Sequence, residues 1–346
     1  MAEMSKKERF EAVVNGELPD RVPVHDVACI AMSKATGNIW KDLRFNVEAS
    51  TKATLEYNKL SDSDFCFGMM ETSSMFSDLG VDVSQPEDNY GNVGSFYFSS
   101  PEDIETKELY DPSDRSQSPL VHKGIIDKIQ DYRKNKTSDQ LTCGWSWGAF
   151  TTAGFLRGPE NLLMDVLEDP DSAKKAVCKA AKLVDGLIRE DSVGVDVIWI
   201  ADPTSTGGMI DEAMFREFVL PETKKLVEGW KRDFGVPVMY HVCGDTMPII
   251  DAVPETGIDI FSIDHAMNMA AARERVKDKI CLMGNVDPIT TLLNGTPEDV
   301  TRESKRIIEE GGADGRFILA GGCEVARDTP IENIQAMVSA AKNYRY

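Results

Sequence analysis

The sequence predicts an α/β protein built as a single (β/α)8 TIM barrel. Along the C-terminal half, short runs rich in β-branched residues alternate regularly with amphipathic helical stretches. The short runs are apolar throughout, which is typical of parallel strands covered by helices on the outside. A length of 346 residues is ordinary for one such barrel.

The N-terminal elements are predicted from local signals. Ser5 and Glu8 have the spacing of a capping box, which predicts a short helix that ends at Asn15-Gly16. We expect an extended segment over Val22–Ile30 and a further strand near Asp64–Met69.

The remaining elements follow the alternation. The expected strands are Leu141–Trp147, Val195–Ile200, Pro237–Val242, Ile258–Ile263, Ile280–Met283 and Arg316–Ala320. The expected helices are one opening at Gly158-Pro159, one following Pro170, and then Glu212–Arg232, Met247–Val253, Ala270–Val276, Pro297–Glu310 and Ile331–Asn343. With the two N-terminal segments the strands number about eight, which fits a closed barrel better than an open sheet.

The stretch from about residue 84 to residue 119 interrupts this organisation. It is rich in Ser, Asp, Glu, Pro and Gly and has few aliphatic residues. We interpret it as a long excursion over the surface, a lid or an additional subdomain element. Residues 1–346 are therefore expected to form one barrel domain with an N-terminal helical extension and this polar excursion.

The composition excludes several classes of protein. The chain has 38 Lys+Arg against 58 Asp+Glu, a formal net charge of −20, which disfavours binding to nucleic acid or to an anionic membrane surface. No apolar run has the length of a signal peptide core or a membrane span. Seven cysteines, an odd and scattered number, do not indicate a disulfide framework, so we expect a cytoplasmic protein.

Polar side chains follow five consecutive predicted strands. These residues are Asp202, then His241 and Cys243, then Asp264 and His265, then Asn285 and Asp287, and finally Cys323 and Glu324. In a parallel barrel the carboxyl ends of the strands meet on one face, where active sites are built. We therefore expect these side chains to converge.

The residue types indicate a metal. His241 and Cys243 are two apart on a strand and therefore face the same side, and Cys323 ends another strand. One imidazole and two thiolates suit Zn²⁺, with either Asp264 or an exchangeable substrate in the fourth position. We interpret the other cysteines as packing residues: Cys29, Cys66, Cys143, Cys178 and Cys281.

Several motifs give the chain a family resemblance. They are Lys7-Glu8-Arg9-Phe10, Pro19-Asp20-Arg21-Val22-Pro23-Val24, His241-x-Cys243-Gly244, Gly284-Asn285-Val286-Asp287-Pro288 and Gly321-Gly322-Cys323 followed by Thr329-Pro330-x-Glu332-Asn333. Together they resemble the uroporphyrinogen decarboxylase superfamily, and within it the zinc-dependent corrinoid methyltransferases. The family fold is a (β/α)8 barrel, and its zinc motif falls on His241, Cys243 and Cys323.

The resemblance implies a reaction. Zinc would activate a thiol such as coenzyme M, and the thiolate would take a methyl group from methylcobalamin carried by a separate corrinoid protein. Asp202 and Asp264 are the candidate catalytic carboxylates, and Asn285 and Asp287 are candidate cofactor contacts. A carboxylate that ends a strand is otherwise often the cap of the next helix.

Three alternatives stay open. Trp145, Trp147, Phe150 and Phe155 form a cluster suited to an aromatic ring, so the protein would instead take methyl from a methoxylated aromatic and load it onto the corrinoid protein. The three ligands would alternatively hold a structural zinc, although such sites usually have four Cys or His ligands. Uroporphyrinogen decarboxylation itself is disfavoured, because the family's arginine pair has no counterpart between Val22 and Asp42.

Overall fold

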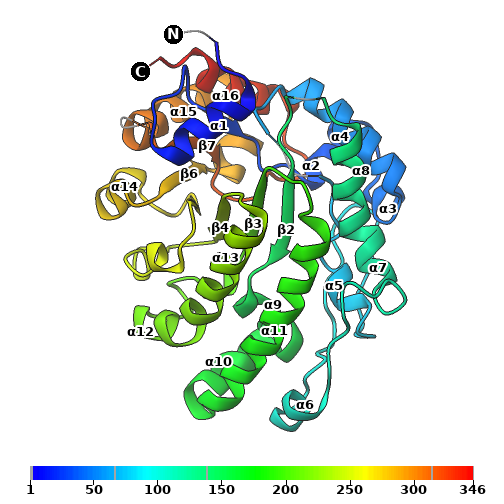
Figure 1. Ribbon diagram of the computed structural model, residues 1–346. Coiled ribbons are helices and arrows are strands. Elements are labelled where there is room, and N and C mark those ends of the chain that lie inside the picture. The colour runs from blue at the N-terminus through cyan, green and yellow to red at the C-terminus, as the bar shows by residue number, and fades with distance from the viewer. Residues whose placement is uncertain (1–2, 66–67, 138, 313–314, 346) are drawn as a thin grey trace.

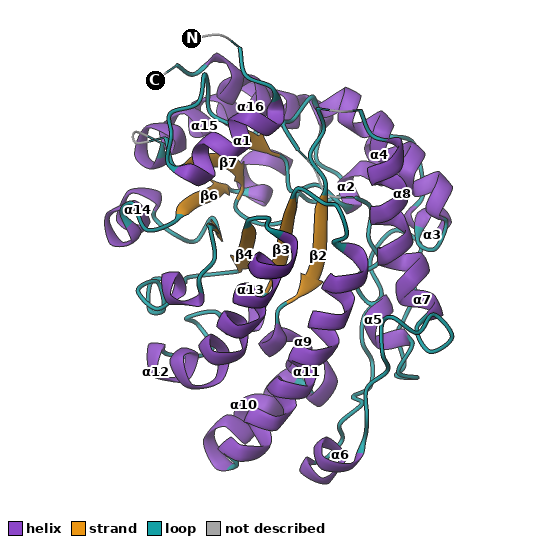
Figure 2. Ribbon diagram, in the orientation of Figure 1, coloured by secondary structure: helices purple, strands orange, loops and turns teal. Residues whose placement is uncertain are grey.

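A parallel β-sheet curled around a central axis forms the middle of the molecule (Figure 2). The structure is a computed structural model and describes residues 3–65, 68–137, 139–312 and 315–345. The strands are β1 (Val24–His25), β2 (Cys143–Trp147), β3 (Val197–Ala201), β4 (Val238–Val242), β5 (Ile260–Ile263), β6 (Cys281–Val286) and β7 (Phe317–Gly321). Their order in the sheet is β1-β7-β6-β5-β4-β3-β2, so neighbours in sequence are neighbours in space except where β1 meets β7.

The sheet closes through one residue at the position expected for the eighth strand. Phe65 forms a parallel bridge with His25 of β1 on one side and with Leu141, just before β2, on the other. The predicted strand near Asp64–Met69 is thus reduced to this bridge in its described part, and residues 66 and 67, including Cys66, lie outside the described residues. The predicted α/β barrel fold is confirmed, with seven strands and a bridging residue among the described segments.

Helices surround the sheet (Figure 1). Those before β2 are α1 (Lys6–Asn15), α2 (Ile30–Ala35), α3 (Trp40–Leu43), α4 (Val47–Ser61), α5 (Ser74–Ser77), α6 (Pro101–Thr106), α7 (Pro119–Val121), the π-helix η1 (His122–Ile126) and α8 (Asp127–Asn135). Those after β2 are α9 (Ala149–Arg157), α10 (Pro159–Glu168), α11 (Pro170–Asp191), η2 (Pro203–Ser205), α12 (Glu212–Met214), η3 (Phe215–Val219), α13 (Leu220–Phe234), η4 (Val253–Thr256), α14 (Met269–Val276), η5 (Pro288–Leu293), α15 (Pro297–Gly311) and α16 (Ile331–Asn343). None of the helices in the described segments combines the length and the apolar character needed to span a membrane.

Two sequence predictions of local structure were wrong, and one helix was missed. The extended segment Val22–Ile30 pairs only at Val24–His25, because the chain turns at Val27, whose φ is 49°, and α2 begins at Ile30. The stretch Met247–Val253, predicted as a helix, forms turns that lead into η4, with i→i+3 hydrogen bonds from the N–H of Ile249 to the carbonyl of Thr246 and from the N–H of Ala252 to the carbonyl of Ile249. Helix α9 was not predicted, because its β-branched Thr151 and Thr152 and its Gly154 weaken the helical signal.

The polar excursion at 84–119 is largely irregular. It contains α6 and the start of α7, and Val83 and Val93 at its beginning form an isolated antiparallel bridge. The chain termini lie at the top of Figure 1, whereas α6, α10 and α12 lie at the opposite end, toward which the carboxyl ends of the strands point. The excursion therefore reaches the face of the barrel where the strands end.

Candidate metal centre and substrate cavity

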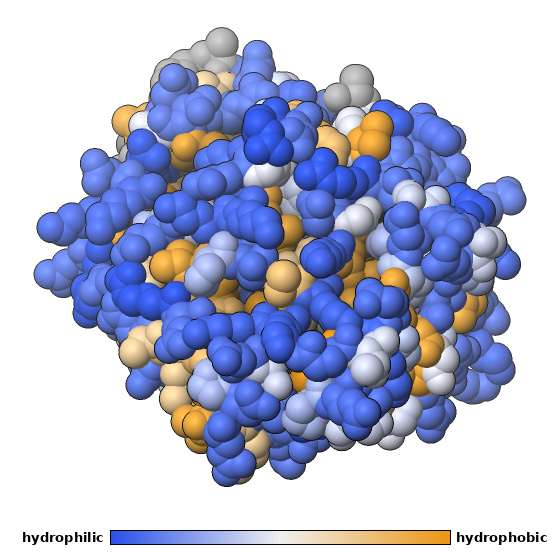
Figure 3. Space-filling model, turned by 60° about the horizontal axis from the view of Figure 1, so that its bottom comes forward, coloured by the Kyte–Doolittle hydropathy of each residue, from blue (hydrophilic) through white to orange (hydrophobic). Residues whose placement is uncertain are grey.

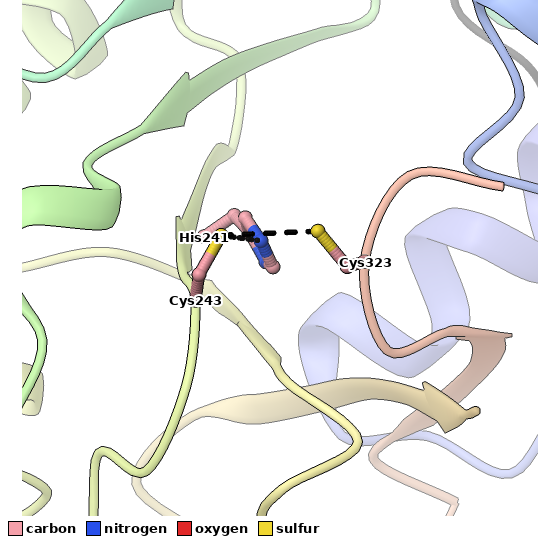
Figure 4. A group of neighbouring side chains, drawn as sticks. All are labelled: His241, Cys243 and Cys323. Carbon is pink, nitrogen blue, oxygen red and sulfur yellow. Dashed lines mark hydrogen bonds between the residues drawn. The ribbon is translucent and has the colours of Figure 1, made fainter. Parts of the chain in front are cut away.

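Three predicted ligands meet at the carboxyl ends of two strands. His241 lies in β4 and Cys243 directly follows it, while Cys323 follows β7. Figure 4 shows the three side chains pointing toward one another from these two segments. The Nε2 atom of His241 is 3.3 Å from Sγ of Cys243, which is 3.8 Å from Sγ of Cys323. The potential ligand atoms all lie within 4.8 Å of one another.

This spacing fits a tetrahedral zinc ion. Two sulfur atoms bound to one tetrahedral zinc ion at the usual zinc–sulfur bond length lie about 3.8 Å apart. The distance between the Sγ atoms of Cys243 and Cys323 matches this value. On His241, Nδ1 faces the carbonyl oxygen of Ser262 at 3.1 Å and the hydroxyl of Ser262 at 3.0 Å. A carbonyl oxygen only accepts, so Nδ1 carries the proton and Nε2 presents its lone pair to the other two ligands.

The thiols influence each other's ionisation. The hydrogen bond from Cys243 lowers the pKa of Cys323, and the imidazole of His241 acts in the same direction. The same thiol pair, together with burial, raises the pKa of Cys243. The protein alone thus favours one thiolate, and a divalent cation supplies the charge that favours two.

Asp264 and Asn285 lie beside this group but hold the loop that follows β5. The Asp264 carboxylate accepts a hydrogen bond from the backbone N–H of Ala266 at 2.9 Å and lies 2.8 Å from Nδ1 of His265. The amide of Asn285 donates to the carbonyl oxygens of Asp264 and Met267, at 3.0 and 2.8 Å. Asp264 is near enough to act on His241 electrostatically, but it does not belong to the group of converging ligand atoms.

The two other predicted carboxylates are tied to helix starts. Asp202 is fully buried and accepts hydrogen bonds from the backbone N–H of Thr151 in α9, at 2.7 Å, and from the Tyr240 hydroxyl, at 3.0 Å. Burial raises the pKa of Asp202. Asp287 caps η5 through the N–H groups of Ile289 and Thr290, both at 2.8 Å. Neither side chain lines the cavity described next, and both fit the capping alternative.

A cavity of about 500 Å³ opens above the three ligands, and its lining is mostly apolar. Besides His241, Cys243 and Cys323, it is lined by a group of aromatic side chains: Phe76, Phe96, Trp145, Trp147, Phe155 and Trp199. Figure 3, which turns the lower end of Figure 1 forward, shows apolar residues near the centre of a mostly hydrophilic face, with smaller apolar patches toward its edges. Of the predicted aromatic cluster, Phe150 is buried in the core instead.

The excursion supplies one wall of this cavity. The hydroxyl of Tyr90 donates to Oε1 of Glu324 at 2.6 Å, and the backbone N–H of Ile30 donates to the same oxygen at 2.9 Å. Burial raises the pKa of Glu324 to about 7. Cys29, interpreted as a packing residue, is buried and also lines the cavity, and burial raises its pKa to about 12.

Sequence reasoning missed several lining residues. Trp199 pairs in register with Trp145 and is two residues from Ala201, so strand alternation places all three on the cavity side, an arrangement that the sequence alone does not give. Tyr90 and Phe96 have no such alternation, since they lie in irregular chain.

The family of the chain follows from comparison with known proteins. The family model for uroporphyrinogen decarboxylase (URO-D) matches residues 5–344, so the chain belongs to the URO-D family. Methylcobamide:CoM methyltransferase MtbA of Methanosarcina mazei is 37% identical over 153 residues, 44% of this chain and 43% of MtbA. Methylcobamide:CoM methyltransferase MtaA of Methanosarcina barkeri is 25% identical over 362 residues, 99% of each chain.

Decarboxylases and a solved structure match as well. A uroporphyrinogen decarboxylase of Wolbachia is 27% identical over 322 residues, 89% of this chain and 87% of that enzyme. A methyltransferase from Methanosarcina mazei has the same fold, with a TM-score of 0.83 at 24% identity over 98% of this chain and 99% of that chain. The resemblance predicted from the motifs is confirmed, and the choice between the activities of these relatives depends on the site.

Proposed function

We propose that this protein is a zinc-dependent corrinoid methyltransferase that moves a methyl group between a corrinoid and a zinc-bound substrate. The observation that carries the proposal is the convergence of His241, Cys243 and Cys323 at the floor of a cavity. Three protein ligands and an open side are typical of catalytic rather than structural zinc. The names of the relatives MtbA and MtaA agree with this activity.

The proposed acceptor is a thiol, of which coenzyme M is the one named for the relatives. When bound, zinc lowers the pKa of a coordinated thiol, so that its sulfur is a nucleophile at neutral pH. His241 is held by Ser262 with Nε2 directed at the ligand position, and the two cysteines supply charge that keeps the sulfur electron-rich.

The transfer balances without an external oxidant or reductant. The thiol releases its proton to solvent, a sulfur–carbon bond forms, and the cobalt–carbon bond breaks with its electron pair remaining on cobalt. Co(III) thereby becomes Co(I). We propose that the corrinoid arrives on a separate carrier protein, which docks on the face where the cavity opens.

A second candidate is the reverse type of reaction, in which methyl is taken from a methoxylated aromatic and loaded onto the corrinoid protein. The aromatic lining by Trp145, Trp147 and Phe155 favours it. Incubation of the protein with Co(I) corrinoid and methoxyaromatics tests this candidate by the appearance of methylcobalamin absorbance.

The primary test is methyl transfer from methylcobalamin to a panel of thiols, followed by the loss of the methylcobalamin spectrum. We expect activity in the parent and in Cys178→Ala, whose half-buried cysteine lies on α11, outside the cavity lining. Cys323→Ala is expected to lose activity by about 10³-fold or more, because an incomplete ligand set no longer activates the sulfur. Equal activity in both variants would contradict the proposal.

A further inference from the structure

The charged side chains that line the cavity limit which thiols it can bind. Among the described residues that line it, none is lysine or arginine, and Glu324 is the one carboxylate. A sulfonate or carboxylate held away from the metal ligands would lose its hydration without gaining a lysine or arginine partner in the lining.

Two basic side chains near the cavity are engaged in ion pairs. Arg44 pairs with the buried Glu71 at 2.9 Å, and Arg327 pairs with Asp88 at 3.0 Å. Lys128 is buried with Nζ 5.7 Å from the ring centre of Trp40; this nitrogen has no hydrogen-bond partner among the described residues, but the side chain does not line the cavity. The described cavity lining therefore presents no lysine or arginine as counterion for a sulfonate or carboxylate.

The floor of the cavity is aromatic right beside the metal ligands. The register of β2, β3 and β4 places Trp147, Ala201 and His241 in one row. Because neighbouring strands are about 4.8 Å apart, Trp147 lies two strand spacings from His241, with only the small Ala201 between them. The ring of Trp199 is 6.2 Å from the imidazole of His241, between ring centres.

The remaining rings form a continuous wall. Trp145 and Trp147 lie 5.0 Å apart at 72°, Trp147 and Phe155 lie 5.5 Å apart, and Phe155 and Phe76 lie 4.9 Å apart, between ring centres. These rings are in edge-to-face and tilted contact, and the aromatic ring of a ligand can make further contacts of the same kind with them.

Building on the proposed function, we infer that the substrate is an uncharged thiol carrying an aromatic group, and that the site discriminates against anionic thiols such as coenzyme M. The sulfur is held at His241, Cys243 and Cys323, and the ring occupies the space above Ala201, against Trp147 and Trp199. Burial of the apolar ring favours binding of the aromatic thiol, whereas the cost of desolvating a sulfonate disfavours binding of coenzyme M.

The turnover experiment compares three thiols with methylcobalamin and the zinc-loaded protein: 2-phenylethanethiol, 2-mercaptoethanol and 2-mercaptoethanesulfonate. We expect kcat/KM for the aromatic thiol to exceed that for the sulfonate by about 30-fold or more, with 2-mercaptoethanol between them. A preference for the sulfonate would overturn this inference while leaving the methyltransferase proposal standing. Failure of all three thiols would count against the thiol acceptor, and the binding experiment then decides the inference.

The binding experiment needs no turnover. The protein is titrated with 2-phenylethanol and with 2-hydroxyethanesulfonate, which lack the thiol, and binding is followed by the quenching of tryptophan fluorescence. Saturable quenching by the aromatic alcohol alone supports the inference, whereas binding of the sulfonate alone, of both equally, or of neither contradicts it.

Two variants locate the effect. Ala201→Leu fills the space between Trp147 and His241, so the ratio of kcat/KM for 2-phenylethanethiol to that for 2-mercaptoethanol is expected to fall by about 10-fold. Lys128→Met removes the unengaged buried cation and is expected to leave that ratio and the sulfonate discrimination unchanged. A sulfonate preference that disappears in Lys128→Met would show that Lys128 is recruited as a counterion and would overturn the inference. Zinc content and the melting curve verify that each variant is folded.

Discussion

The two halves of the barrel are held together in different ways. From β3 to β7 every pair of neighbouring strands forms a parallel ladder of three to five residue pairs. Between β1 and β2 the described chain offers only the bridges of Phe65 to His25 and to Leu141.

Side-chain ion pairs compensate for the short ladder in the N-terminal half. Asp64 is fully buried and accepts hydrogen bonds from the backbone N–H of Val24 at 2.9 Å and from the guanidinium groups of Arg9 and Arg21, at 2.9 and 2.8 Å. The metal ligands come from the half with regular ladders, where backbone hydrogen bonds fix each strand end. Tyr90 and Phe96, on one wall of the cavity, come from the irregular half. The metal ligands and the rings of Trp147 and Trp199 thus lie on or directly after regularly paired strands, whereas irregular chain closes the cavity.

The largest expected effect on stability comes from Asp64→Ala. It leaves Arg9 without one of its partners in a site where its side chain is 2% exposed, so we expect the free energy of unfolding to fall by about 3–5 kcal/mol. Urea denaturation of the variant and of Asp62→Asn provides the measurement. Asp62 forms only a surface ion pair with Lys342, so its replacement is expected to cost at most about 1 kcal/mol. Similar midpoints in the two variants would show that the buried ion pairs of Asp64 do not stabilise the N-terminal half.

A smaller effect is expected from Ser262→Ala, which tests how the regular half orients a ligand. The variant removes the hydroxyl near Nδ1 of His241 and leaves the backbone carbonyl in place. Zinc affinity is expected to fall by about 10-fold, the lower end of the range for such supporting contacts. Competition with a chromogenic chelator measures it, and an unchanged affinity would show that the carbonyl alone suffices.

The smallest effect is expected from Tyr90→Phe, which probes the irregular half. Loss of the hydrogen bond to Glu324 is expected to loosen the segment around Tyr90 by about 1 kcal/mol. Hydrogen exchange of residues 82–96 reports this change. The matched control is Tyr97→Phe, whose hydroxyl donates to the exposed carbonyl of Glu108, and a response as large as that of Tyr90→Phe would remove the distinction between buried and exposed contacts.

The same contrast explains how much the sequence predicted. His241, Cys243 and Cys323 could be placed because they end strands of a parallel barrel, whose topology brings strand ends together whatever lies between them. Asp202 and Asp287 could not be distinguished from catalytic carboxylates, because a carboxylate after a strand is equally suited to cap the next helix.

The remaining cavity residues are placed by tertiary contacts, which produce no periodic pattern in the sequence. Tyr90 and Phe96 lie in irregular chain and reach the cavity only because the excursion folds back over the strand ends. The length of β1 was overestimated, because the apolar run that contains it gives no sign of the turn at Val27. Local patterns predicted the barrel, the ligands and the aromatic side chains Trp145, Trp147 and Phe155, whereas the contributions of Tyr90 and Phe96 required the structure.

We propose that the zinc held by His241, Cys243 and Cys323 serves chemistry rather than folding. The decisive measurement is elemental analysis of zinc in the freshly purified parent, in Cys323→Ala and in Cys178→Ala, with a melting curve for each. We predict close to one zinc per chain in the parent and in Cys178→Ala, and much less in Cys323→Ala at nearly the same melting temperature. A parent without zinc, or a Cys323→Ala variant that loses both its zinc and its fold, would contradict the account.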